Sequence, residues 1–139
     1  MAYWLFKSEP DVFSWEQLVA KGKAGEEWTG IRNYQARNNM RAMKLGEKGF
    51  FYYSNEGKVV VGIVEVCKLA HRDSTSDVET WDCVDIRAVS KLPKPVTLDQ
   101  IKADAKLAGM VLVNNSRLSV QPVTAAEWAH ICGLAGLKA

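Results

Sequence analysis

The 139-residue sequence has few of the residues that mark secreted or zinc-binding proteins. Its three cysteines, Cys67, Cys83 and Cys132, lie far apart and form no C-x-x-C motif. The two histidines, His71 and His130, stand at no metal-ligand spacing from the cysteines. These spacings argue against a disulfide framework or a zinc site, and they favour a protein of the reducing cytosol.

Long apolar stretches are also missing. Residues 1–7 lack the apolar region of a signal peptide, and no segment approaches the roughly 20 apolar residues of a transmembrane helix. We therefore expect a protein that is not secreted and has no membrane partner. The expected location is the cytoplasm of a bacterial-type cell, or its nucleoid.

Recognised catalytic motifs are absent from the sequence. It contains no phosphate-binding G-x-x-x-x-G-K-[ST], no dinucleotide-binding G-x-G-x-x-G, no H-E-x-x-H and no G-x-S-x-G. The aspartates form no recognisable pair, and neither histidine is placed by sequence near a cysteine. We accordingly expect no catalytic residue, no metal and no cofactor, and an enzyme is the less favoured alternative.

What the chain does have is the composition of one globular domain spanning residues 1–139. Hydrophobic residues make up 47% and charged residues 24%, which argues against disorder. The net charge of +2 is too small to indicate a nucleic-acid partner by itself. Five tryptophans are many for this length. Tryptophan is usually a core residue, but it is also a preferred side chain for stacking on bases.

The order of local patterns predicts an α+β domain built on a curved sheet or small barrel. Aromatic and β-branched runs predict strands, and three S/T-x-x-E/Q capping boxes, at Ser14, Thr97 and Thr124, predict helix starts. Gly62, inside the longest apolar run, predicts a bend or a close backbone approach. Strands are expected at 3–6, 50–54, 59–69, 84–88 and 118–123, and helices at 15–21, 98–106 and 125–132. The polar segment 71–80 is expected to be an exposed loop, and the prolines of 91–95 are expected to end the strand before them.

The segment 28–44 stands out because amides and basic residues crowd one side of it. Apolar Ala36, Met40 and Met43 recur at helical spacing and predict a face turned to the core. Three asparagines lower the helix propensity unless they cap or bind something. We interpret the other side as a recognition surface whose basic residues contact a nucleic-acid backbone: Arg32, Arg37, Arg41 and Lys44.

Polar groups also follow aromatic residues at the ends of several predicted elements. Two tryptophan faces with short hydroxyl and amide groups suit a planar ligand with a polar edge, such as a nucleobase. Taken singly, each tryptophan is more easily a core residue, each arginine a solvated charge, and each Ser or Asn part of a turn. The joint pattern favours a pocket formed by Lys7, Ser8, Glu9, Trp28, Arg32, Asn33, Tyr34, Tyr53, Ser54, Asn55 and Trp81.

Four segments, at 3–10 (YWLFKSEP), 28–38 (WTGIRNYQARN), 51–55 (FYYSN) and 116–123 (SRLSVQPV), resemble the motifs of the EVE domain family. The resemblance covers nearly the whole chain and implies a PUA-like fold. This is a compact curved β-barrel of about five or six mostly antiparallel strands with short helices packed around it. The family is similar to YTH domains, which read methylated adenine in RNA.

The resemblance further implies binding of a modified base, such as a modified cytosine or a methylated adenine, in DNA or RNA. It maps the pocket onto Lys7–Glu9, Trp28 with Asn33, and Tyr53–Asn55, with Trp81 as a second aromatic wall. Arg117, in the last motif, joins the residues expected at the nucleic-acid backbone. The expected protein is a monomer that relies on a separate effector protein for any downstream action.

Two other functions remain open from the sequence. The first is an enzyme that acts on a nucleotide or nucleotide-like ligand in the same pocket, with Lys7, Glu9 or His71 as acid or base. The second is a structural role, in which the surface around Trp28 is an interface with another protein.

Overall fold

The computed structural model describes residues 2–54, 57–115 and 117–137. Its β-strands are β1 (Tyr3–Ser8), β2 (Glu26–Glu27), β3 (Lys48–Tyr53), β4 (Val59–Arg72), β5 (Asp82–Thr97) and β6 (Val120–Val123). Its α-helices are α1 (Trp15–Ala20), α2 (Tyr34–Ala42), α3 (Leu98–Lys102), α4 (Val111–Asn114) and α5 (Ala125–Leu134), with 3₁₀ turns η1 (Gly22–Ala24) and η2 (Ala105–Leu107). No helix of these described ranges has the length and apolarity to cross a bilayer.

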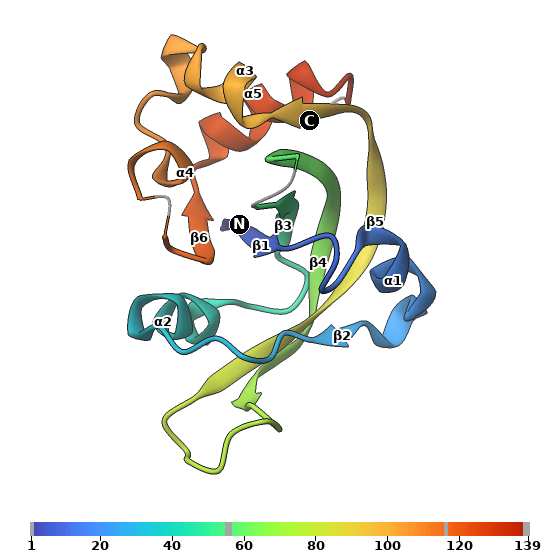
Figure 1. Ribbon diagram of the computed structural model, residues 1–139, viewed down its shortest axis with the longest axis vertical. Coiled ribbons are helices and arrows are strands. Elements are labelled where there is room, and N and C mark those ends of the chain that lie inside the picture. The colour runs from blue at the N-terminus through green and yellow to red at the C-terminus, as the bar shows by residue number, and fades with distance from the viewer. Residues whose placement is uncertain (1, 55–56, 116, 138–139) are drawn as a thin grey trace.

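The strands form one six-stranded sheet in the order β2-β5-β4-β3-β1-β6. All neighbouring strands run antiparallel except β1 and β3, which are parallel. The predicted α+β class with a curved, mostly antiparallel sheet is confirmed. In the described part of the chain the sheet is open, with β2 and β6 as its edge strands. Figure 1 shows that the long strands β4 and β5 are curved.

Two apolar clusters lie on opposite faces of the sheet, because successive strand residues point to opposite sides. In β1, Phe6 joins one cluster and Leu5 the other, and in β3 Phe51 and Phe50 divide in the same way. Helices α1 and α2 cover the Phe6 side, whereas α3, α4 and α5 cover the Leu5 side (Figure 1). The Phe6 cluster also contains Trp28, so the predicted pocket wall begins inside the core.

The three predicted capping boxes are all present, at Ser14, Thr97 and Thr124. Gly62 is also where the predicted close approach occurs. A Cβ atom there would lie 2.4 Å from the Trp15 ring.

The predicted end of a strand at residues 91–95 is wrong, since β5 continues to Thr97. The register pairs Gly62 with Lys91 and Val60 with Val96, so the residues between bulge out of the ladder. Proline fits in this bulge because it has no backbone N–H that would be left without an acceptor there. The amide of Lys94 instead donates to the carbonyl of Ala135 in the C-terminal region, at 3.1 Å.

The helix predicted at 98–106 is also too long. α3 ends at Lys102, and Asp104 then caps the separate turn η2 by accepting from the Lys106 amide at 3.0 Å. An aspartate that bonds the backbone two residues ahead favours such a new turn over helix continuation.

Candidate functional site

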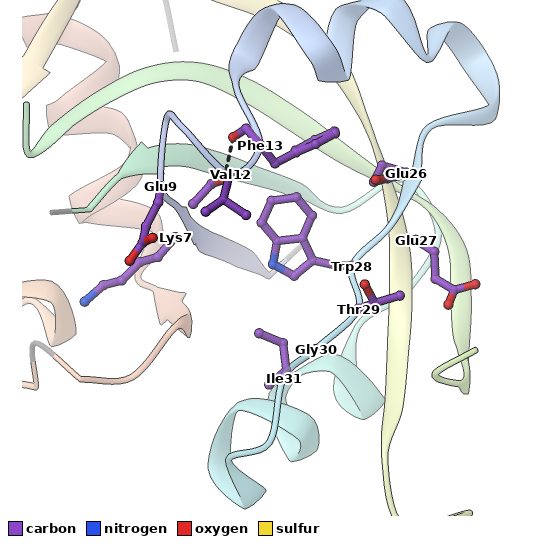
Figure 2. A pocket seen from close by; sticks show the side chains of 11 residues that line it. Lys7, Glu9, Val12, Phe13, Glu26, Glu27, Trp28, Thr29, Gly30 and Ile31 are labelled. Atoms are coloured by element: carbon purple, nitrogen blue, oxygen red, sulfur yellow. Dashed lines mark hydrogen bonds between the residues drawn. The ribbon is translucent and has the colours of Figure 1, made fainter. Parts of the chain in front are cut away.

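A pocket of about 530 Å³ lies between the end of β1 and the segment that leaves β2 (Figure 2). One wall comes from residues 7–13 and the other from residues 26–31. Four predicted site residues line it, namely Lys7, Ser8, Glu9 and Trp28. The other lining residues, which the prediction did not include, are Val12, Phe13, Glu26, Glu27, Thr29, Gly30 and Ile31.

Trp28 is both a core residue and a pocket residue. Only 7% of its surface is exposed, and its amide donates to the Val84 carbonyl at 2.9 Å. Phe6, Phe13 and Phe51 pack edge-on around the indole with ring centroids 5.8–6.0 Å away. Figure 2 shows the ring at the centre of the lining residues. Within the described ranges the indole N–H has no acceptor, so it remains available to a ligand.

The end of β1 and the loop that follows it form one wall of the pocket. The Ser8 hydroxyl donates to the Phe13 carbonyl at 2.6 Å, which closes this loop, and the Ser54 amide donates to the Ser8 carbonyl at 2.9 Å. Burial lowers the pKa of Lys7. Glu9 is exposed at the pocket edge, and Figure 2 shows Lys7 and Glu9 on the side away from Glu27.

The opposite rim is fixed by a residue that the prediction missed. Asp73 accepts from the Gly30 amide at 2.8 Å and from Arg32 Nη1 at 3.1 Å, both through Oδ2. It is only 1% exposed, although the pattern of segment 71–80 predicts an exposed loop. Burial works to raise the pKa of Asp73, but hydrogen bonds from Thr75, Gly30 and Arg32 bring it below the ordinary value. The aspartate also accepts from the Thr75 amide two residues ahead, a local turn that the sequence D-S-T could have indicated.

Trp81 lies in a second aromatic cluster and does not line the Trp28 pocket in the described structure. Its ring packs against Tyr34 at 5.0 Å between centroids, and Tyr34 is 62% exposed. The Arg32 and Arg37 guanidinium groups lie 5.6 and 6.0 Å from the Trp81 ring, and Arg37 lies 4.9 Å from Tyr34. We call these four residues the Trp81 cluster.

The basic residues predicted at the nucleic-acid backbone divide into two kinds. Arg37 donates to the Thr80 carbonyl at 3.1 Å, and Arg41 forms an ion pair with Asp82 at 2.7 Å, so both tie α2 to the start of β5 and the residues just before it. Lys44 and Arg117 are exposed, on the turn after α2 and the turn before β6.

The remaining predicted residues make contacts within the protein. The Asn33 side chain caps α2 by accepting from the Ala36 amide at 2.9 Å. The Tyr53 hydroxyl accepts from the Trp15 amide at 2.7 Å, and Ser54 lines a separate cavity of about 280 Å³. Asn55 lies outside the described residues. None of these contacts brings Asn33, Tyr53 or Ser54 into the lining of the Trp28 pocket.

Comparisons with known proteins agree with this architecture. The EVE domain family profile matches residues 2–134. Human thymocyte nuclear protein 1 is 34% identical, over 96% of this chain and 73% of that protein.

Among solved structures, a protein of Agrobacterium tumefaciens is 63% identical with a TM-score of 0.96, covering 99% of this chain and 94% of that one. The human THYN1 protein in complex with 5-methylcytosine-containing DNA is 34% identical with a TM-score of 0.91, covering all of both chains. The YTH domain of Zygosaccharomyces rouxii MRB1 is similar in fold alone, at 19% identity and a TM-score of 0.58, covering 99% of this chain and 88% of that one.

Proposed function

The chain belongs to the EVE domain family, and from this premise we propose that it is a non-catalytic module that binds nucleic acid and holds a modified base in the Trp28 pocket. The base is a modified cytosine or a methylated adenine. Support comes from the human relative whose structure contains 5-methylcytosine DNA. A separate effector protein would carry out any later step.

The observation that carries the proposal is the unused indole N–H of Trp28 beside a pocket with a carboxylate at its edge. A nucleobase offers an acceptor and an exocyclic amine on one planar edge, which a tryptophan N–H and the Glu9 carboxylate would complement. Stacking of a base on an aromatic side chain is worth about 1–3 kcal/mol. That gain would offset the few kcal/mol needed to unstack a base from its neighbours.

The Trp81 cluster would receive the nucleotide next to the captured base. Its exposed Tyr34 ring and nearby guanidinium groups suit stacking together with phosphate contact. Four basic residues would contact the phosphates of the nucleic-acid backbone: Arg37, Arg41, Lys44 and Arg117. Asn33, Tyr53 and Ser54 would support the binding surface from the positions around it, and Asn55 keeps its predicted role in ligand binding.

Titration with matched oligonucleotides tests the proposal. DNA and RNA strands carrying cytosine, 5-methylcytosine, 5-hydroxymethylcytosine, adenine or N6-methyladenine would be added while tryptophan fluorescence is recorded. We expect a saturable change with tighter binding of one modified strand. If no strand changes the fluorescence or binds by anisotropy, the proposal fails. Mass spectrometry of the recovered strands separates binding from chemistry, because a converted product would favour the enzyme alternative.

A further inference from the structure

Three side chains from three strands lie close together at the edge of the sheet, and one of them belongs to Glu27, the residue directly before Trp28. Glu27 of β2, His71 of β4 and Asp85 of β5 each offer a ligand atom, and these atoms all lie within 4.8 Å of one another. Glu27 and Asp85 are cross-strand partners, and an irregularity between Lys68 and His71 in the β4–β5 ladder brings the imidazole alongside. No metal-ligand spacing is visible in the sequence because the three residues come from distant segments.

We propose that Glu27, His71 and Asp85 bind one divalent transition-metal ion, with Zn²⁺ as the ion best suited to the donor set. One imidazole nitrogen and two carboxylates are typical ligands of such ions, whereas Mg²⁺ and Ca²⁺ prefer oxygen alone. Tetrahedral bonds of about 2.0–2.2 Å place ligand atoms roughly 3.3–3.6 Å apart. The flexible Glu27 side chain would therefore move toward the ion, and the 2.7 Å contact between His71 Nε2 and Asp85 Oδ1 would open by less than about 1 Å. Three protein ligands leave a position for water.

Hydrogen bonds from neighbouring groups fix the orientation of His71 and Glu27, as hydrogen bonds to the ligands do in known metal sites. His71 Nδ1 lies 3.0 Å from the Arg72 carbonyl, so Nδ1 carries a proton and Nε2 faces Asp85 Oδ1 at 2.7 Å. Glu27 Oε1 accepts from the Ser74 amide at 2.9 Å, which leaves Oε2 for an ion. In the contact with Asp85 Oδ1 the Nε2 atom shares a proton with the carboxylate, and a bound ion would displace that proton and take the Nε2 lone pair while Nδ1–H stays on the carbonyl.

Two carboxylates at this edge favour a cation, and Lys68, the cross-strand partner of Asp85, is the opposing positive charge. In the described ranges, neither Glu27 nor Asp85 forms an ion pair with a lysine or arginine, and His71 is the one basic partner of Asp85. The His71 and Asp85 side chains are 24% and 18% exposed, so an ion can enter from solvent. The ion would join β2, β4 and β5 directly before the pocket wall, and the proposal does not depend on nucleic-acid binding.

The chain contains its own control, because its other histidine also pairs with a carboxylate. His130 Nε2 lies 2.5 Å from Asp104 Oδ2, but the described residues contain no third ligand there. Chelator-treated protein would be titrated with Co²⁺ by visible absorption and with Zn²⁺ by calorimetry. The variants are His71→Ala, Glu27→Gln and Asp85→Asn, with His130→Ala and Cys67→Ser as controls.

We expect one ion per chain in the wild type and in both controls. The three site variants should bind at least about tenfold more weakly. Zn²⁺ should also shift the ring nitrogen resonances of His71, and not those of His130, in the unaltered protein. This NMR measurement needs no variant, so a variant that fails to fold leaves the test intact. Absence of binding at millimolar metal, unchanged binding by His71→Ala, or a shift of His130 alone would overturn the proposal.

Discussion

A hydrogen bond of 2.8 Å joins the Gly30 amide to Asp73 Oδ2 across 43 residues of sequence. The same oxygen accepts from Arg32 at 3.1 Å, so one buried carboxylate holds two points of the segment that follows Trp28. Gly30 has a φ of +84°, a conformation that glycine adopts without strain. The pocket rim therefore depends on a residue outside the pocket.

Asp73→Ala is expected to destabilise the protein. Removal of the carboxylate leaves the Gly30 amide without its acceptor, and hydrogen bonds to a charged group contribute about 1.5–3 kcal/mol each. We expect a loss of that order in the free energy of unfolding, measured by urea denaturation. Asp77→Ala, an exposed site in the same segment, should stay within about 0.5 kcal/mol of the wild type. Equal stability of the two variants would contradict the role of Asp73.

The sequence predicts features that depend on neighbouring residues, and it does not predict contacts between distant segments such as the one between Asp73 and Gly30. Capping boxes at Ser14, Thr97 and Thr124 depend on residues three apart, and all three were correct. The contact between Asp73 and Gly30 depends on where β4 ends relative to β2, which no local pattern specifies. The same limit applies to the pocket. The joint pattern of aromatic and polar residues predicts Lys7, Trp28 and Trp81 around one ligand, whereas in the structure Lys7 and Trp28 line one pocket and Trp81 lies in its own cluster.

Glu47 makes stability depend on pH. It is 6% exposed, and burial works to raise its pKa, but donation from the Lys44 amide, the Trp4 indole and the Ala2 amide brings it below the ordinary value of 4.5. A lowered pKa in the folded state means that the charged form stabilises the protein above pH 4.5. This contribution is lost as the pH falls below that value.

Urea unfolding of the wild type and Glu47→Gln between pH 3 and pH 7 checks this. The wild type should be more stable near neutral pH, and the difference should shrink as the pH falls through 4.5. A difference that grows toward acid would show the opposite sign and rule out the explanation.

Gly62→Ala should reduce stability because its Cβ would overlap the Trp15 ring at 2.4 Å. Overpacking of this kind costs about 1–3 kcal/mol. Thermal or urea unfolding measures the loss, and Gly109→Ala is the matched control because no atom lies within 4 Å of the position its new methyl group would take. A neutral effect at Gly62 would mean that α1 shifts freely over the sheet.

Arg41→Ala should weaken the binding of modified and plain oligonucleotides about equally. A lost phosphate contact lowers affinity without regard to base identity and makes the slope of log K against log salt shallower by about 0.9 per contact on duplex DNA. Lys44→Ala should act in the same way without loss of the Arg41–Asp82 ion pair. Lys94→Ala, at the α5 side of the molecule, is the control. An unchanged salt slope in both α2-side variants would remove this surface from the binding site.

Trp28→Ala should abolish the preference for a modified base over its plain form. It also removes a buried aromatic ring, which costs about 3–5 kcal/mol of stability, so the sharper variant is Trp28→Phe. Phenylalanine keeps an aromatic ring among Phe6, Phe13 and Phe51 but lacks the N–H donor. Anisotropy with labelled modified and plain strands should show the affinity ratio falling toward one, whereas Trp81→Phe should weaken both strands together. A Trp28→Phe protein that folds and keeps the full ratio would show that the indole N–H takes no part in recognition.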